Sequence, residues 1–388
     1  MTAFFKNIWS FLLSLFLIFS CSEDKGILEE SLAQNIALEI NNSLDSVMSR
    51  EDSLLVNSIE NYLTQFDDNN YDHRDSWFYS DSMSVYPYFE LYKNVLESNR
   101  IQVLALIEQG GYKVVKLGFF NGTNIESILN IPAIPSKQMG FIFLNYYDTY
   151  IRVNPERYGN IRYFNHSTYQ LNQEDINEMI RFSKKLSAFF DIPELEFDCY
   201  VFNNSKELFA SLGYDYGSNM YDAYQENSFC RPADWSLFLG TSTAYHPHEL
   251  AHLYVHSFVG NGNPNVANPN KYLDEGFATY FGGAQGGFSL ESSTQMALDD
   301  FETREICFEN KDQLGFLIEE IVNFKNVFYG NFIKYLIDFH GPEYALHALK
   351  TYKTDDELDL LIDSHRLPDE TFNDFVFRII MSNNFDNE

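Results

Sequence analysis

The stretch His248-Glu249-Leu250-Ala251-His252 decides how this 388-residue chain is interpreted, because its spacing fits a helix that presents a metal site. Residues four positions apart lie on one face of an α-helix, so the imidazoles of His248 and His252 can converge on one metal ion. Glu249 can then reach a water molecule beside the metal, which suits a general base. Accidental spacing on a surface helix is the alternative interpretation.

Glu275 is the candidate for a third metal ligand. A catalytic zinc ion usually has three protein ligands and a fourth position open to water or substrate. Residues 272–281 predict a short helix closed by Gly282-Gly283, and the segment 260–270 contains too many turn residues to continue the first helix. The chain is therefore expected to fold back and bring Glu275 to the histidines. A solvated carboxylate at a helix start is the other interpretation.

The two segments together resemble the gluzincin metallopeptidases, and among them the peptidase MA-like group related to the aminopeptidase N family. The resemblance rests on the residues from His248 to His252, followed by Glu275-Gly276-Phe277-Ala278. It implies a zinc ion held by His248, His252 and Glu275, and peptide-bond hydrolysis in which Glu249 is the general base.

The resemblance also implies roles for residues around the ligands. Asp274 stands where asparagine is common in the family, so its hydrogen bond to a metal ligand is expected to differ in character. Thr279 is a second candidate for contact with the ligands. Tyr329 is the nearest candidate for the family's oxyanion-stabilising tyrosine, although its register relative to Gly330 differs from the family's.

Two further departures concern the type of peptidase. Twenty-two residues separate His252 from Glu275, which lengthens the family's connection. A Gly-Ala-Met-Glu-Asn type segment, which recognises the substrate amino terminus in aminopeptidases, does not precede the zinc helix. An endopeptidase is therefore expected rather than an exopeptidase.

A different class of function is a surface lipoprotein that binds peptide or glycan and keeps the zinc helix only as structure. The presence of Glu249 argues against it, because a structural zinc site needs no base and is normally closed by a fourth protein ligand. A zinc hydrolase acting on another bond is a third candidate. His256 lies too far along a straight helix to share a metal with His248, so it is interpreted as a packing residue or a contact of the ligands.

Residues 1–21 are expected to be a lipoprotein signal peptide. An apolar run over residues 8–19 has the length of a signal-peptide core and is short for a membrane span. The step to Cys21 resembles a bacterial lipobox, in which the cysteine is lipidated, and the acidic residues after it resemble Bacteroidetes lipoprotein export signals. This implies an outer-membrane lipoprotein on the periplasmic or cell-surface face. An uncleaved membrane anchor is the alternative.

The composition is that of an acidic globular protein. The 26 basic and 56 acidic residues give a formal charge of −30, which argues against nucleic acid or an anionic membrane surface as a partner. A peptide or protein substrate is what the family resemblance implies. Beyond Cys21, the cysteines are Cys199, Cys230 and Cys307. A Cys199–Cys230 disulfide is expected, and free buried thiols are an equal alternative. Oligomeric state is left open.

The expected fold class is α+β, with two domains after the leader. Residues 22–155 are expected to form an α+β domain of unknown role. Apolar periodicity predicts helices over 28–48 and 55–66, and strands over 101–107, 112–120 and 141–153, with a hairpin at Gly110-Gly111.

Residues 156–388 are expected to form a zincin-like metallopeptidase domain with a small sheet and a helical C-terminal half. A helix over 173–190 capped by Asn172 and a strand over 195–201 are predicted. Residues 235–239 are expected to be the sheet edge beside the zinc helix, where an extended peptide could add as a strand. The chain after Glu275 is expected to be helical, with Phe332, Tyr335, Leu336 and Phe339 on a core face.

Overall fold

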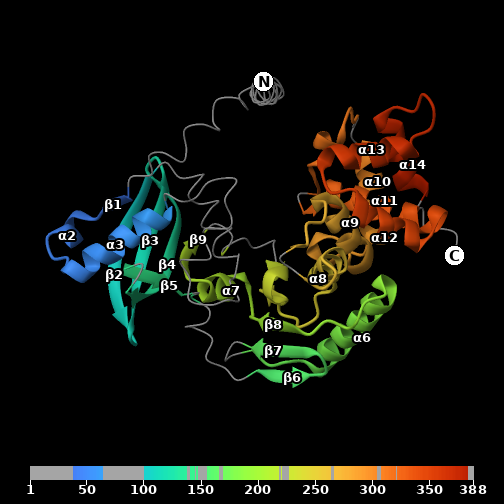
Figure 1. Ribbon diagram of the computed structural model, residues 1–388. Helices are drawn as coiled ribbons and strands as arrows, with labels where there is room; N and C mark the ends of the chain where they lie inside the picture. The colour runs from blue at the N-terminus through green and yellow to red at the C-terminus, as the bar shows by residue number, and fades with distance from the viewer. Residues whose placement is uncertain are drawn as a thin grey trace, which may run out of the picture.

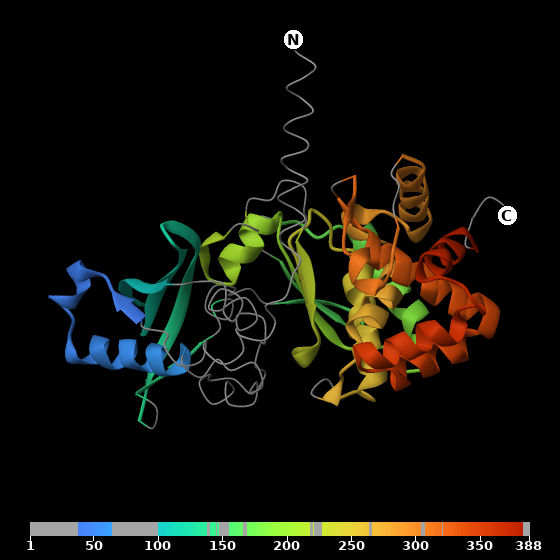
Figure 2. The ribbon, with the colours of Figure 1, turned by 90° about the horizontal axis from the view of Figure 1, so that it is seen from above.

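The computed structural model describes residues 38–63, 100–137, 140–144, 146, 155–165, 169–217, 220, 227–263, 266–303, 307–319 and 321–382. Its helices and strands form the α+β fold expected from the sequence. Figures 1 and 2 show a first sheet with helix α3 at one end of the molecule and a helical C-terminal part at the other, with a second sheet between them.

A six-stranded sheet forms the N-terminal part of the fold. Its strands are β1 (Leu38–Ile40), β2 (Arg100–Gln109), β3 (Tyr112–Asn121), β4 (Asn124–Ser136), β5 (Gly140–Phe143) and β9 (Tyr214–Gly217). Strands β1 to β5 lie in that order, and β9 pairs with β4. The predicted hairpin is confirmed, because β2 and β3 join at Gly110 and Gly111, whose positive φ angles glycine adopts without strain. Helix α3 (Arg50–Leu63) packs Leu55 and Ile59 into the core of this sheet.

Two N-terminal predictions are wrong in part. The helix expected over 28–48 is replaced at Leu38–Ile40 by β1, which pairs in parallel with β2, and only the short helix α2 (Asn42–Asp45) follows. The strand forms because its pairing with β2 outweighs the helical periodicity of the apolar residues in this segment. The strand expected over 141–153 ends at Phe143. Residues 28–37 and most of 145–154 lie outside the described residues.

The helix of the predicted metal site packs on the second sheet. Its strands lie in the order β10 (Ser228–Arg231), β11 (Ser236–Leu239), β8 (Phe197–Val201), β7 (Ile161–Asn165) and β6 (Glu156–Tyr158). The prediction that residues 235–239 form the edge is wrong, because a tight turn at Pro232–Asp234 adds β10 antiparallel to β11 on its outer side. Among the described strands, β10 and β6 are the two edges, and β10 packs beside helix α8 (Pro247–Val259).

Helices α6 (Gln173–Phe190) and α8 contribute to the core on one face of the second sheet. The Asn172 side chain caps α6 by accepting a 2.9 Å hydrogen bond from the Glu174 backbone N–H, as predicted. The buried Tyr254 hydroxyl of α8 lies 2.8 Å from the Ser183 hydroxyl of α6 and accepts a hydrogen bond from the Leu195 N–H. These contacts fix α8 against the sheet and α6.

The chain after residue 270 is mainly helical, as predicted. Its helices are α9 (Lys271–Gly282), α10 (Leu290–Thr303), α11 (Phe324–His340), α12 (Pro342–Thr351), α13 (Asp355–His365) and α14 (Phe372–Ser382), with a strand pair, β12 (Leu317–Ile318) and β13 (Val322–Asn323), before α11. Phe332 and Leu336 of α11 are buried, as expected. Phe339 is 61% exposed, so its place on the core face is wrong. It lies in the last turn of α11, where its ring contacts Tyr335.

The other face of the second sheet packs into the core of the first sheet. Four aromatic rings lie in register across β7, β8, β11 and β10, with centroid separations of 4.6, 4.6 and 4.9 Å: Phe164, Tyr200, Phe238 and Phe229. Helix α7 (Ser205–Ser211) and β9 then lead the chain back to the first sheet. Residues beyond 155 therefore supply a strand to the first sheet, and the domain division at 155 stays a prediction.

The described cysteines are free thiols, so the expected Cys199–Cys230 disulfide is wrong. The sheet register explains this, because Cys230 lies opposite Leu237 of β11, which in turn lies opposite Cys199. Two strand spacings of about 4.8 Å each therefore separate the two cysteines. A disulfide needs Cα atoms within about 7 Å of each other.

The predicted signal peptide and Cys21 lie outside the described residues. Within the part that the structure describes, no helix combines the length and apolar character needed to cross a membrane. Attachment to a membrane through Cys21 therefore stays a prediction.

Helices α8 and α9 run antiparallel and approach closely at Gly282. A Cβ atom added to this glycine would lie 2.3 Å from the backbone nitrogen of His248 and 2.4 Å from its Cα. These atoms belong to the first turn of α8 and cannot move without displacing that helix. Glycine at the end of α9 thus permits the helix contact that the predicted metal site requires.

We expect Gly282→Ala to destabilise the fold by about 1–3 kcal/mol, because the added methyl group overpacks a backbone contact. The measurement is denaturant unfolding of the purified chain. Gly315→Ala is the control, since a Cβ there meets its nearest atom at 3.5 Å, an ordinary contact. Equal stability of the two variants would contradict the close approach.

Candidate metal centre

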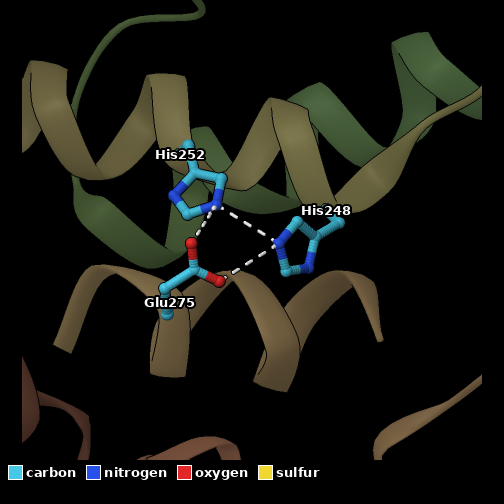
Figure 3. A group of neighbouring side chains, drawn as sticks. All are labelled: His248, His252 and Glu275. Carbon is cyan, nitrogen blue, oxygen red and sulfur yellow. Dashed lines mark hydrogen bonds and ion pairs between the residues drawn. The ribbon is translucent and has the colours of Figure 1, made fainter. Parts of the chain in front are cut away.

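The structure brings His248, His252 and Glu275 together (Figure 3). One turn of α8 separates the histidines and directs both rings toward α9, which presents Glu275. The two Nε2 atoms lie 3.2 Å apart. Glu275 Oε2 lies 3.6 Å from His248 Nε2, and Oε1 lies 3.8 Å from His252 Nε2. All three predicted ligands therefore face one point.

These separations fit a tetrahedral ion. Zinc bonds of about 2.0–2.2 Å to nitrogen and oxygen place neighbouring ligand atoms about 3.3 Å apart. The observed ligand–ligand distances of 3.2, 3.6 and 3.8 Å are close to this value. Among the described residues, no other histidine, cysteine, aspartate or glutamate joins these three as a fourth ligand. The site can thus hold a metal ion with three protein ligands.

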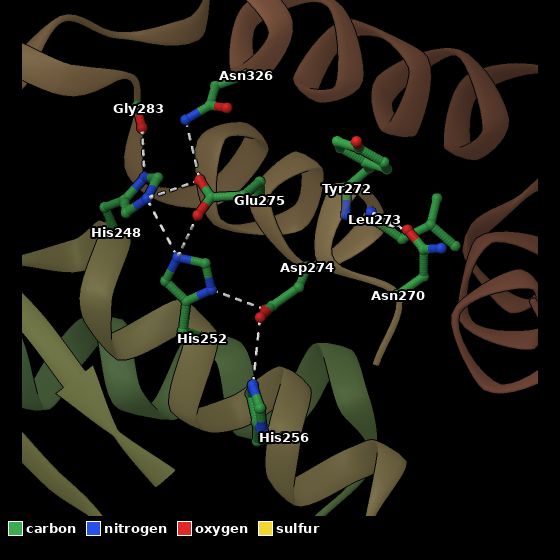
Figure 4. A network of polar contacts seen from close by, with 10 residues as sticks. All are labelled: His248, His252, His256, Asn270, Tyr272, Leu273, Asp274, Glu275, Gly283 and Asn326. Atoms are coloured by element: carbon green, nitrogen blue, oxygen red, sulfur yellow. Dashed lines mark hydrogen bonds and ion pairs between the residues drawn. The ribbon is translucent and has the colours of Figure 1, made fainter. Parts of the chain in front are cut away.

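Hydrogen bonds on the far side of each ring orient the two histidines for metal binding (Figure 4). The Nδ1 atom of His248 lies 2.8 Å from the Gly283 carbonyl oxygen, and Nδ1 of His252 lies 2.7 Å from Asp274 Oδ1. Both partners accept hydrogen bonds, so each Nδ1 carries a proton and each Nε2 can offer its lone pair. The predicted role of Asp274 as a contact of a ligand agrees with this placement.

Two further side chains support the carboxylates. His256 Nε2 lies 3.2 Å from Asp274 Oδ2, in agreement with its interpretation as a neighbour of the ligands. Asn326, in the first turn of α11, donates a 3.0 Å hydrogen bond from Nδ2 to Glu275 Oε2. No sequence signal identified Asn326, because it lies 51 positions after Glu275 and reaches it only through helix packing.

The start of α9 fixes the direction in which Asp274 and Glu275 point. The Asn270 side chain accepts hydrogen bonds from the backbone N–H groups of Tyr272 and Leu273, at 3.0 and 3.4 Å. This cap sets the first turn of α9. Asp274 then faces the C-terminal half of α8, and Glu275 faces the two Nε2 atoms (Figure 4).

When no metal is bound, the charged groups of the cluster shift one another's pKa values. Burial alone would lower the pKa of His252, but the Asp274 carboxylate, with smaller contributions from Glu275 and Glu249, raises it to about 10. Burial would raise the pKa of Glu275, but its hydrogen bond with His248 and the charge of His252 hold it below its usual value. The metal-free cluster therefore holds a proton on His252 at neutral pH, and a metal ion must displace it.

Glu249 lies beside the ligands and does not join them. Burial raises the pKa of its carboxyl group, whereas the charges of His252 and His248 and a hydrogen bond from the Cys230 backbone N–H oppose the increase. Cys230 belongs to the edge strand β10. The predicted base thus lies between the metal ligands and the open edge of the sheet.

His246 forms the N-cap position of α8, as expected from the proline that follows it. Burial and the neighbouring His248 and His252 lower its pKa to about 3, so the imidazole is neutral. Its Nδ1 atom is buried and has no hydrogen-bond partner among the described residues. His246 therefore adds no positive charge to the cluster.

The structure does not bring Tyr329 or Thr279 into contact with the ligands. Tyr329 is fully buried, and its ring stacks on Tyr272 with centroids 5.1 Å apart. Burial raises its pKa, and the charged groups that add to the shift lie on α13 and at Asp312 rather than in the cluster. Thr279 packs against Gly330, where α11 approaches α9. The predicted contact of Thr279 with the ligands is therefore wrong, because the packing of α11 on α9 holds its side chain in the core. The Tyr329 hydroxyl is buried as well, and its role as an oxyanion donor stays a prediction.

We expect binding of a divalent metal ion such as zinc to release a proton, because the metal replaces the proton that Asp274 stabilises on His252. Affinity should therefore rise with pH up to about 10, where that proton is lost. Calorimetry at pH 8, in buffers of different ionisation enthalpy, counts the protons released. Asp274→Asn removes the charge, so the pKa of His252 should fall and fewer protons should be released. Equal release from both proteins would contradict this account.

Comparison of the chain with protein-family models, curated proteins and solved structures finds no match. The assignment of the metal centre therefore rests on the geometry of its residues. That geometry identifies a site able to hold a metal ion between α8 and α9.

Proposed function

We propose that the protein is a zinc-dependent peptidase of the gluzincin type, and that it is an endopeptidase of the cell envelope. The observation that carries the proposal is the convergence of His248, His252 and Glu275 on one point, with Glu249 beside them. Such a site combines an incomplete metal coordination shell with an adjacent base.

Zinc is the proposed metal because the donor set consists of two imidazoles and one carboxylate. This set is typical of catalytic zinc, and imidazole disfavours calcium and magnesium. The site groups three donor residues, whereas structural zinc sites are usually closed by four. The donor count therefore supports a catalytic site over the alternative of a binding lipoprotein with a structural zinc helix.

Bound zinc would supply a Lewis acid that polarises the scissile carbonyl and acidifies water. Glu249 would accept a proton from the attacking water and pass it to the leaving amine. Burial raises the pKa of this carboxyl group, which suits a group that must both accept and donate a proton.

Peptide is the proposed substrate because the edge of the second sheet adjoins the base. The Cys230 backbone of β10 lies near enough to Glu249 to lower the pKa of its carboxyl group, and β10 packs beside α8, so this edge strand borders the ligand cluster. An extended peptide that adds to β10 would place a backbone carbonyl near the metal. This mode of binding does not require a chain terminus, which favours an endopeptidase.

The location is proposed from the leader sequence. A lipid on Cys21 would attach the enzyme to the outer membrane, as in the Bacteroidetes-type lipoproteins that the leader resembles. The formal charge of −30 disfavours close contact with an anionic membrane surface. A lipid anchor is compatible with this charge, because it needs no basic surface.

We expect Glu249→Gln to keep zinc and to lose peptide cleavage by about 10²–10⁴-fold, because the amide cannot act as a base. The measurement is mass spectrometry of a diverse peptide mixture after incubation with the full-length chain, with zinc content determined in parallel. Glu291→Gln is the matched control, since Glu291 is an exposed residue in the first turn of α10.

The products distinguish the candidate functions. Internal cuts made by wild type and by Glu291→Gln, and absent from Glu249→Gln, would support an endopeptidase. Terminal cuts would support an exopeptidase. A folded, zinc-loaded wild type that produces no fragments would refute the peptidase and favour the binding lipoprotein or hydrolysis of another bond.

We expect Tyr329→Phe to leave the turnover number unchanged and stability unchanged or slightly higher, because its buried hydroxyl has no hydrogen-bond partner among the described residues. Tyr254→Phe is the contrasting variant. It should lose about 1 kcal/mol of stability, because the Tyr254 hydroxyl contacts Ser183 and the Leu195 N–H. Steady-state kinetics and thermal unfolding measure both effects. A large loss of turnover in Tyr329→Phe would restore its role as an oxyanion donor.

A further inference from the structure

His256 is connected to the metal site through Asp274. The Asp274 carboxylate has one oxygen for each of two histidines: Oδ1 lies 2.7 Å from His252 Nδ1, and Oδ2 lies 3.2 Å from His256 Nε2. Figure 4 shows the three side chains in a row that ends at the ligand cluster. Asp274 is buried, so water competes little for either oxygen.

The helix geometry explains why these residues meet. His252 and His256 are four positions apart on α8, so they lie on the same face. Asp274 lies in the first turn of α9, which crosses this face. His256 is one turn too far along α8 to reach the ion with His248. Its contact with the site is therefore indirect.

The second hydrogen bond constrains the carboxylate of Asp274. With His252 alone as partner, the carboxylate group could still rotate about its bond to Cβ and offer either oxygen. Contacts at both oxygens fix the plane of the carboxylate, and this in turn fixes the tautomer and the orientation of His252.

We propose that His256 is a positioning residue of the metal centre, which holds Asp274 in the orientation that directs the His252 Nε2 lone pair at the ion. The proposal rests on the zinc site proposed above and adds a residue outside its ligand set. His256, Asp274 and His252 then act as one unit, and metal affinity depends on a side chain that cannot itself contact the metal.

The test compares zinc affinities of the full-length chain, measured by competition with a chromogenic chelator. His256→Leu removes the donor and should weaken zinc binding about tenfold, whereas the His256→Gln amide can donate to the same oxygen and should recover most of the loss. His347→Leu is the matched control, because His347 is exposed on α12 and its hydrogen bond is with Thr351 of the same helix.

A spectroscopic measurement separates positioning from general stability. With Co²⁺ in place of zinc, the visible absorption reports coordination geometry. The spectrum should change in His256→Leu, and it should match wild type in His256→Gln and His347→Leu. Thermal unfolding of the metal-free proteins checks that each variant folds. If His256→Leu does not fold, His256→Asn replaces it, because the shorter amide should not reach Asp274 and should show the same loss.

Two results would overturn the inference. One is zinc affinity and a cobalt spectrum in folded His256→Leu that equal those of wild type. The other is an equal loss in His256→Gln and His256→Leu, which would indicate packing rather than hydrogen bonding. Either result leaves the proposed peptidase intact if wild type binds zinc and cleaves peptides. Failure of wild type to bind zinc would instead refute the proposed function together with this inference.

Discussion

The close antiparallel crossing of α8 and α9 is the contact on which the site depends. Helix α8 carries both histidines and α9 carries Glu275, so the ligand set exists only where the two helices approach. Gly282 permits the approach at one end, and Asp274 joins the helices at the other by accepting hydrogen bonds from α8. A shift of one residue in either helix would turn a ligand by about 100° and disperse the site.

The same crossing concentrates carboxylates in a largely apolar region, which is unfavourable unless each has partners. Asp274 faces two histidines, Glu275 accepts a hydrogen bond from Asn326, and Glu249 is reached by a backbone N–H of β10. These partners come from three different elements, α8, α11 and β10. Their convergence pre-organises the cluster for a cation, because the negative groups are already oriented when the ion arrives.

The second sheet connects this centre to the rest of the molecule. One of its faces contributes to the core with α6 and α8, and the other carries the aromatic rings that lead into the first sheet. Strand β10 lies at the meeting point, since Phe229 belongs to the row of rings and Cys230 faces Glu249. The position of the sheet edge beside the base is therefore set by packing on both sides of the sheet.

The sequence by itself determined the α+β class, the Asn172-capped helix, the Gly110-Gly111 hairpin and the three residues that converge on the metal position. These features follow from periodicity, capping and turn preference, which act over a few residues and so are visible locally. Only the tertiary structure decided that β10 rather than β11 is the edge beside α8, that Cys199 and Cys230 lie two strands apart, that Tyr329 is fully buried and that Asn326 supports Glu275. Each of these depends on strand order or on helix packing between segments that are distant in the sequence. The residues around any one position carry no pattern that reveals such contacts.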